Sequence, residues 1–448
     1  MLINLATEAL PIGLKAKSSD GYSLDRVASI VLAGGQGVRL FPLTATRCKP
    51  TISFGGRYNL IDVPISHSIN SGIKQIFIIG QYLAYTLQKH LFQTYLNYGV
   101  NPGQIQLLIP EEREEGKIWY KGTADAIRQN LHYLGEMQVD YFLILSGDQL
   151  YNIHFQKMFD YARKTDAGMV IATLPVNEKD AKRMGLLKID EEGRLSDFFE
   201  KPQEKSILND YYTDDETLQG MGFEVEEGRN YLGSMGIYLF KRQVLIDLLN
   251  EDPREDFGKH LITTQMKKGD VRAFLYDGYW EDIGTIDAYY RANLLLTRSS
   301  DDNKKGLQCY DEKDMIYTRS YHLPGAKISG TRITNSIICE GTVCDAEEIS
   351  HSIIGVRSVI KTGTVIRESI LMGNEYYEAL TSEPQIGENC QIVKTIIDEN
   401  VSIGHNVKLI NKRNLMEYDS PPGTPKIHVR DGIIVVPRGV SLPDHFSF

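Results

Sequence analysis

Between residues 27 and 298, short apolar runs alternate with amphipathic stretches. An apolar run of four to six residues that is closed by a glycine or a polar residue is typical of a buried strand. Such runs lie at residues 30–33, 76–80, 141–145, 169–172 and 234–239. Because strands and helical patterns alternate, the sequence predicts an α/β domain with a mostly parallel sheet that binds ligands at the carboxyl ends of its strands.

One of the amphipathic stretches shows its helical spacing clearly. Its apolar residues, at steps of three and four, are Ala124, Ile127, Leu131 and Leu134. Thr123 precedes them and is placed to cap the helix. In contrast, the acidic residues 209–230 are interpreted as a solvated loop.

The pattern of apolar and polar residues changes after residue 298. A polar stretch is followed, beyond about Lys327, by apolar residues six apart, such as Ile354, Ile360 and Ile366. A hexapeptide period predicts a parallel β-helix, in which inward residues stack from coil to coil. Such a domain usually serves as a packing surface for assembly. Acyltransferase chemistry, using His351 or His405, is a weaker alternative.

These patterns divide the 448 residues into four segments. They are an N-terminal tail or packing arm (1–26), an α/β domain (27–298), a linker (299–326) and a β-helix (327–448). No functional motif is recognised after residue 410.

Composition narrows the class of protein. A net charge of −10 argues against a nucleic-acid partner. The five cysteines form no Cys-x-x-Cys pair, which indicates reduced thiols rather than disulfides or a zinc site. No apolar run is long enough to span a membrane, and the first residues do not resemble a secretory signal, so a cytoplasmic location is expected.

The first strand leads directly into a glycine-rich loop, Gly34-Gly35-Gln36-Gly37. Glycines let the backbone approach a ligand closely, and the freed N–H groups can bind phosphate. Arg39, Arg47 and Lys49 follow and would neutralise a polyphosphate. The loop matches neither the P-loop nor the dinucleotide fingerprint, and a plain turn with solvated cations remains the alternative.

Two aspartates are candidates for a metal site. Asp148 follows the strand at residues 141–145, and Asp282 precedes a helical pattern. Mg²⁺ is typically held by one or two carboxylates together with phosphate oxygens. Each aspartate could instead be a helix N-cap. Glu200-Lys201 is either a phosphate-binding pair or a surface ion pair before a turn.

Taken together, these motifs resemble the ADP-glucose pyrophosphorylases (glucose-1-phosphate adenylyltransferases), with residues 275–282 closest to the plant and cyanobacterial branch. The resemblance covers about residues 27–410 and implies a Rossmann-like nucleotidyltransferase sheet followed by a left-handed parallel β-helix. Its motifs are LAGGQGVRL (32–40), RCKP (47–50), WYKGTADA (119–126), GD (147–148), EKP (200–202), SMGIY (234–238) and WEDIGT (280–285).

The resemblance also implies roles for individual residues. Arg39, Lys49 and Asp148 would be catalytic, and Asp148 and Asp282 would coordinate Mg²⁺. The nucleotide, ATP, would be bound by Gly34, Gly35, Gly37 and Gln81. Glucose 1-phosphate would be bound by Tyr120, Gly185, Glu200, Lys201 and Ser234, with Lys201 on its phosphate.

The implied activity is transfer of AMP from ATP to glucose 1-phosphate, which gives ADP-glucose for glycogen or starch synthesis. The alternatives are a transferase that uses UTP, GTP or dTTP and a catalytically silent regulatory subunit. The family usually forms tetramers, either of one chain or with a second subunit type. Thr46, Asn59 and Glu399 depart from the family's cationic activator-site pattern, although Lys412 is kept, so weak or altered activator control is expected.

Overall fold

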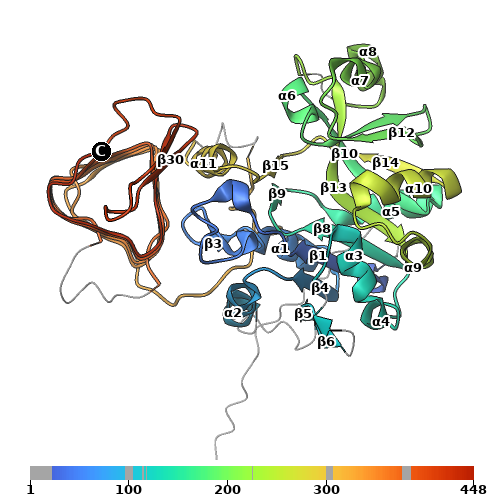
Figure 1. Ribbon diagram of the computed structural model, residues 1–448, viewed down its shortest axis with the longest axis horizontal. Coiled ribbons are helices and arrows are strands. Elements are labelled where there is room, and N and C mark those ends of the chain that lie inside the picture. Colours follow the sequence, from blue (N-terminus) through green and yellow to red (C-terminus); the bar gives the residue numbers. More distant parts are fainter. Residues whose placement is uncertain are drawn as a thin grey trace, which may run out of the picture.

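The computed structural model describes residues 23–95, 104–113, 116, 117, 119–223, 226–298, 306–375 and 385–448. An α/β domain occupies the centre and right of Figure 1, and a β-helix lies on the left. Of the predicted N-terminal tail, Leu24–Arg26 form a 3₁₀ turn, and Leu24 is buried in the core. Within the described residues, no helix has the length and apolar content needed to cross a bilayer.

In the described residues, nine strands form the main sheet, in the order β12-β11-β13-β8-β1-β4-β5 with β10 and β14 attached through β13. Their bounds are β1 (Val27–Ala33), β4 (Gln75–Gly80), β5 (Ile105–Leu108), β8 (Tyr141–Ser146), β10 (Met169–Val176), β11 (Gly185–Ile189), β12 (Leu195–Glu200), β13 (Tyr231–Lys241) and β14 (Val271–Leu275). The predicted strands are therefore confirmed. Alternate residues of β1 enter two separate cores, Val31 on one face and Ile30 on the other, which explains why the runs are continuously apolar.

The direction of the strands differs from the prediction. β1 pairs in parallel with β4 and β8, but β13 runs antiparallel to β8, β10 and β11, so the sheet is mixed rather than mostly parallel. An apolar run reports burial of a strand and not its direction, which is why the pattern could not reveal this.

Helices cover both faces of the sheet (Figure 1). They are α1 (Asp62–Asn70), α2 (Ala84–Tyr95), α3 (Thr123–Gln129), α4 (Leu131–Leu134), α5 (Phe155–Thr165), α6 (Glu178–Ala181), α7 (Lys205–Asp210), α8 (Asp215–Gly220), α9 (Arg242–Glu251), α10 (Ile262–Lys268) and α11 (Ile286–Leu295). A π turn, Phe257–Leu261, precedes α10.

Two helix predictions are wrong. The predicted helix after Thr123 is two helices, because the Asn130 side chain donates to the Ala126 carbonyl and the chain turns there. Thr123 is the first residue of α3 and not its cap; the Ala124 N–H instead donates to the Glu255 carbonyl. The acidic stretch 209–230 is also not a solvated loop, since it contains α8 and buries Leu218 in the core.

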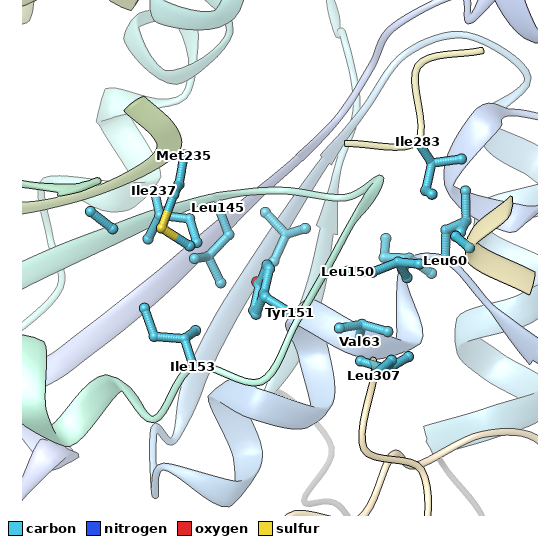
Figure 2. Close-up of a cluster of buried hydrophobic side chains, with 14 of the residues drawn as sticks. Leu60, Val63, Leu145, Leu150, Tyr151, Ile153, Met235, Ile237, Ile283 and Leu307 are labelled. Carbon is cyan, nitrogen blue, oxygen red and sulfur yellow. The ribbon is translucent and has the colours of Figure 1, made fainter. Parts of the chain in front are cut away.

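A small antiparallel pair extends from the main sheet toward the β-helix. It consists of β9 (Gln149–Tyr151) and β15 (Trp280–Asp282), with Gln149 opposite Asp282. Figure 2 shows the core beneath it, where Leu150 and Ile283 lie near Leu60. The side chains of Leu150 and Ile283 are both fully buried. Leu150 therefore fixes the position of Asp148, two residues before it, and Ile283 fixes that of Asp282, directly before it.

The β-helix is confirmed, and its strands explain the six-residue period. One face contains β16 (Lys327–Ile328), β19 (Val343–Cys344) and β22 (Val359–Ile360). The second face contains β17 (Arg332–Thr334), β20 (Glu348–Ser350), β23 (Val365–Arg367), β25 (Gln391–Val393) and β28 (Lys408–Leu409). The third face contains β18 (Ile337–Ile338), β21 (Ile353–Ile354), β24 (Ile370–Leu371) and β26 (Thr395–Ile397). Ile354, Ile360 and Ile366 lie on three successive faces, and all are fully buried.

The segment after residue 410 continues the β-helix and adds a hairpin to it. β31 (Ile433–Val436) pairs in parallel with β26, and β32 (Ser441–Leu442) pairs with β27 (Ser402–Ile403). β29 (Glu417–Asp419) and β30 (His428–Arg430) form an antiparallel hairpin on β31. Sequence analysis found no motif here.

The two domains pack against each other along α11 and the described part of the linker. Leu307 and Ile316 are buried in the core that they share with the α/β domain. The Thr318 hydroxyl donates to Asp62 at 2.7 Å, and the Tyr290 hydroxyl donates to the Glu368 carbonyl of the β-helix at 2.6 Å. Residues 299–305 of the predicted linker lie outside the described residues. The remaining short elements are β2 (Ser53–Phe54), β3 (Tyr58–Asn59), β6 (Glu112–Arg113), β7 (Gly116–Lys117) and the 3₁₀ turns Val38–Leu40 and Lys49–Thr51.

Candidate active site

The glycine loop leaves the sheet at the carboxyl end of β1, between the ends of β4 and β8. Gly37 adopts a left-handed conformation with φ of 63°, and a Cβ atom there would lie 3.0 Å from the Lys49 Cβ and from the Thr44 Cγ2. Thr44 also donates a hydrogen bond to the Gly37 carbonyl at 3.1 Å. Glycine is therefore required at residue 37 both by the backbone conformation and by close packing.

Lys49 lies beneath this loop and is paired with Asp148. Its Nζ atom is 2.5 Å from the Asp148 Oδ2, and the Ser146 hydroxyl donates to the other carboxylate oxygen. Burial raises the pKa of Asp148, but the Lys49 charge and the hydrogen bonds outweigh it and hold this pKa below its usual value. Asp148 follows β8 and precedes β9, so it is not a helix N-cap.

Asp282 and Arg39 both lie close to Gly284, and Asp148 is near Asp282. A Cβ atom at Gly284 would lie 3.1 Å from the Asp282 carboxylate and 3.4 Å from the Arg39 guanidinium. Burial and the nearby Asp148 charge raise the pKa of Asp282. Asp282 belongs to β15, and Thr285 caps α11, so the N-cap alternative is wrong here too.

The donor set of this corner fits Mg²⁺. The carboxylates of Asp148 and Asp282 repel each other, and the paired strands β9 and β15 hold them near one another. A divalent cation would offset their negative charge. In the described part of the chain, no cluster of three or more His, Cys, Asp or Glu side chains could hold a metal. Two aspartates suffice for Mg²⁺ when substrate phosphates supply further oxygens.

The other wall of the site is built around Glu200, the last residue of β12. Cβ atoms at Gly185 and Gly258 would lie 2.8 Å and 2.6 Å from its Oε2 atom, so two glycines make room for this carboxylate. Lys201 has φ of 52° and pairs with Glu200 at 3.0 Å, with a side chain that is 57% exposed. An exposed ammonium at a cavity wall is free to move onto an anionic ligand.

A cavity of about 530 Å³ joins the two walls. Of the residues singled out from the sequence, it is lined by Gly34, Gly35, Gln81, Tyr120, Asp148, Glu200 and Lys201. Lys49 lies behind Asp148, while Gly185 lies behind Glu200. Ser234 is buried, with its hydroxyl accepting from the Gly236 N–H at 3.3 Å. Gly37, Arg39 and Asp282 are also outside this lining.

Sequence analysis missed one segment of the wall, Asp256–Gly258. It is tied to the WYKGTADA motif, because the Phe257 N–H donates to the Thr123 hydroxyl at 3.3 Å. A Cβ atom at Gly122 would lie 2.4 Å from the Glu255 carbonyl, so the two segments touch along their backbones. The one local signal is Gly258 within an otherwise helical pattern, which by itself does not indicate a site.

Arg47 does not belong to the phosphate-binding cluster in which the sequence placed it. It points toward the β-helix, where it pairs with Asp398 at 2.5 Å and Glu399 at 3.0 Å. The side chains of Arg47 and Asp398 are each 2% exposed. The partner of Arg47 is remote in sequence, so local spacing could not separate it from Lys49.

A second cavity, of about 440 Å³, lies at this domain junction. Its lining includes all three residues that depart from the activator pattern, Thr46, Asn59 and Glu399. It also contains Lys89 and Arg438, both of which pair with Glu375. Arg438 pairs with Glu399 as well, at 3.2 Å.

The histidines of the β-helix form structural contacts. The His405 ring accepts the Glu388 N–H at 3.1 Å, and its own backbone N–H donates to Asp444. The His351 ring lies 3.3 Å from the Asn335 amide, in a turn with φ of 46°. Neither contact pairs the histidine with a second catalytic group.

Comparison with protein families agrees with this geometry. A family model described as Nucleotidyl transferase matches residues 28–299, and one described as GLGC left-handed parallel beta-helix domain matches residues 321–446. The chain thus belongs to the nucleotidyl transferase family. This succession of domains is the architecture of ADP-glucose pyrophosphorylase, and the chain is a sugar-phosphate nucleotidyltransferase of that type.

Proposed function

We propose that this chain transfers AMP from ATP to α-D-glucose 1-phosphate, giving ADP-glucose and pyrophosphate for synthesis of an α-1,4-glucan such as glycogen or starch. The observation that carries the proposal is the single cavity of about 530 Å³. It brings the glycine loop and Asp148 together with Glu200 and Lys201, so one site offers groups that would bind a polyphosphate and a sugar phosphate.

The reaction needs alignment and charge more than covalent chemistry. The backbone N–H groups of Gly34 and Gly35, with Arg39 and Lys49, would hold the triphosphate. Lys201 would bind the phosphate of glucose 1-phosphate, and Glu200 and Tyr120 would orient its sugar. A phosphate oxygen of the sugar phosphate then attacks the α-phosphorus in line; a new P–O bond forms as the bond to pyrophosphate breaks.

Asp148 and Asp282 are the residues that would hold Mg²⁺. When bound, the ion supplies positive charge to the phosphate oxygens. Lys49 holds Asp148 ionised and oriented in its absence, since the pair is already formed at 2.5 Å.

The test is release of pyrophosphate by the purified chain. Glucose 1-phosphate and Mg²⁺ are present, with ATP, UTP, GTP or dTTP in parallel reactions. Release with ATP alone supports the proposal and shows that the chain works without a second subunit type. Release with another nucleotide keeps the mechanism and changes the product.

A lack of release with all four nucleotides would instead favour a regulatory subunit. Arg39, Lys49, Asp148, Lys201 and Asp282 are all present, which argues against a silent chain. We further propose a homotetramer, as the family resemblance implies. Light scattering of the purified chain measures its mass directly, and a monomeric mass would reject this assembly.

A further inference from the structure

The β29–β30 hairpin of the C-terminal domain reaches the outer side of the proposed nucleotide site. In Figure 1, β30 lies beside α11, at the junction with the α/β domain. The hairpin and the glycine-loop segment together line a hollow of about 820 Å³. Its lining includes Val38 and Arg39 from the loop and Glu417 and Arg430 from the hairpin.

Phe41 is where the loop meets the hairpin. Its ring lies edge-on to the His428 ring, with 5.1 Å between the centroids, and the Arg430 guanidinium carbon is 5.8 Å from its centroid. Phe41 comes two residues after Arg39 and closes the 3₁₀ turn, since its N–H donates to the Val38 carbonyl at 3.1 Å. A displacement of Phe41 therefore moves the Arg39 backbone as well.

The hairpin is rigid enough to hold Phe41. Arg430 donates to the Tyr418 carbonyl at 3.0 Å and to the Asp419 carboxylate at 2.6 Å, across the two strands. His428 also pairs with Asp419, at 2.5 Å. Because these polar groups bond to one another, the two side chains present fixed surfaces to Phe41.

The same hairpin also contacts the segment that carries Asp282. The carboxylate of Asp431, which directly follows β30, accepts the Asp287 N–H at 3.3 Å in the first turn of α11. Asp287 lies five residues after Asp282. The hairpin thus bridges the two chain segments that bear Arg39 and Asp282.

We propose that the β29–β30 hairpin positions the Arg39 loop for nucleotide binding, with His428 and Arg430 acting through Phe41. The inference rests on the proposed function, because it takes the nucleotide to be the ligand of this loop. It makes the C-terminal domain part of the nucleotide site and not an assembly surface alone. His428 and Arg430 are positioning residues, since they contact Phe41 and not the phosphates.

The experiment compares His428→Ala, Phe41→Leu and the double variant in the full-length protein. We expect the KM for ATP to rise about fivefold in each single variant, as for loss of aromatic and cation–π contacts. The KM for glucose 1-phosphate should stay within about twofold, because its wall is remote from the hairpin. The double variant should be no worse than the poorer single one, since the two residues act through one contact.

Arg413→Ala is the matched control. Arg413 stacks on Tyr418 of β29 and on Phe448, at 5.8 Å and 5.5 Å. It therefore contacts the same hairpin at a residue other than His428 and Arg430, which contact Phe41. If the KM for ATP rises as much in Arg413→Ala as in His428→Ala and Phe41→Leu, the effect is general destabilisation and the proposal is overturned. Unchanged KM for ATP in both His428→Ala and Phe41→Leu would overturn it as well.

Hydrogen exchange of residues 35–41 separates this inference from the proposed function. We expect faster exchange of this segment in His428→Ala than in the wild type or Arg413→Ala. If the wild type turns over none of the four nucleotides, the proposed function fails, and exchange alone decides the role of the hairpin. Equal exchange in the wild type and His428→Ala would reject it.

Discussion

Lys49 and Arg47, two residues apart on one segment, form ion pairs in different parts of the molecule. Lys49 pairs with Asp148 at the candidate active-site cavity, where the carboxylate side chain is 21% exposed. Arg47 meets Asp398 and Glu399 at the domain junction, where Asp398 is 2% exposed. A pair that borders a cavity can exchange its partner for a ligand. Arg47 also lines the junction cavity, but its separation from the buried Asp398 would leave an uncompensated buried charge.

The largest effects are expected when the two cations, Arg47 and Lys49, are removed in turn. Arg47→Met leaves Asp398 buried without its partner, while Glu399 keeps Arg438, so we expect unfolding stability to fall by about 3–5 kcal/mol. Lys49→Met leaves a more exposed carboxylate, so it should lose turnover with a smaller loss of stability. Chemical denaturation measures the first effect and pyrophosphate release the second; equal stability losses would contradict the distinction.

Removal of the Asp148 charge from the Lys49–Asp148 pair should give the next largest effect. Asp148→Asn keeps the shape of the side chain and removes its charge, so kcat should fall roughly 10²–10³-fold, as for other preorganised electrostatic groups. A circular-dichroism spectrum that matches the wild type is the control for folding. Undiminished turnover alongside that spectrum would show that Asp148 has no catalytic role.

His67 differs from the Lys49 and Arg47 ion pairs, because its buried ring is kept neutral and is not part of an ion pair within the described residues. The centroid of its ring lies 5.5 Å from that of Tyr151, and burial lowers the pKa of His67 to about 4. Between that pH and the ordinary pKa of about 6.5, the unfolded chain binds a proton that the folded chain does not. This part of the stability is therefore complete above the ordinary pKa and is lost as the pH falls.

The expected loss for His67 is up to about 2 kcal/mol between pH 7 and pH 5. Urea unfolding at both pH values measures it, and His67→Gln should remove most of the difference. Glu178→Gln, on the remote α6, should keep it, because it leaves His67 and its surroundings unchanged. A wild-type stability that is flat over this interval would contradict the assignment to His67.

The smallest expected effect concerns the junction cavity, where carboxylates offset the cations. We expect fructose 1,6-bisphosphate and 3-phosphoglycerate to activate the wild type weakly. Glu399→Gln removes one nearby negative charge and should tighten anion binding about fivefold, from ~1 kcal/mol per unit charge at 4 Å. Calorimetry with 3-phosphoglycerate measures this, and Glu178→Gln, on the remote α6, controls for net charge. Strong wild-type activation would contradict it.

The sequence predicted those features that depend on local pattern. The glycine loop and Asp148 follow apolar runs, and the ends of neighbouring parallel strands meet at one edge of a sheet, so their proximity could be expected. In the same way, Ile354, Ile360 and Ile366 revealed the β-helix, because each coil repeats the same spacing. The strands and the order of the two domains could therefore be predicted from the sequence alone.

What escaped prediction depends on partners that are distant in sequence. Arg47 and Lys49 look equivalent until Asp398 is seen beside one of them. Leu218 is buried by neighbours from other elements, so an acidic stretch concealed a helix. Likewise, the β29–β30 hairpin acquires its significance from Phe41, and nothing within the hairpin itself indicates a contact with the glycine loop.

The burial of Arg47 has a consequence for synthesis of the chain. Its partner Asp398 is 351 residues further along, so the α/β domain leaves the ribosome well before this carboxylate exists. At ~5–20 residues per second, Arg47 waits for about 20–70 s. During this interval the nascent α/β domain has to keep the guanidinium hydrated. Its final packing around Arg47 therefore cannot be completed before Asp398 has been synthesised.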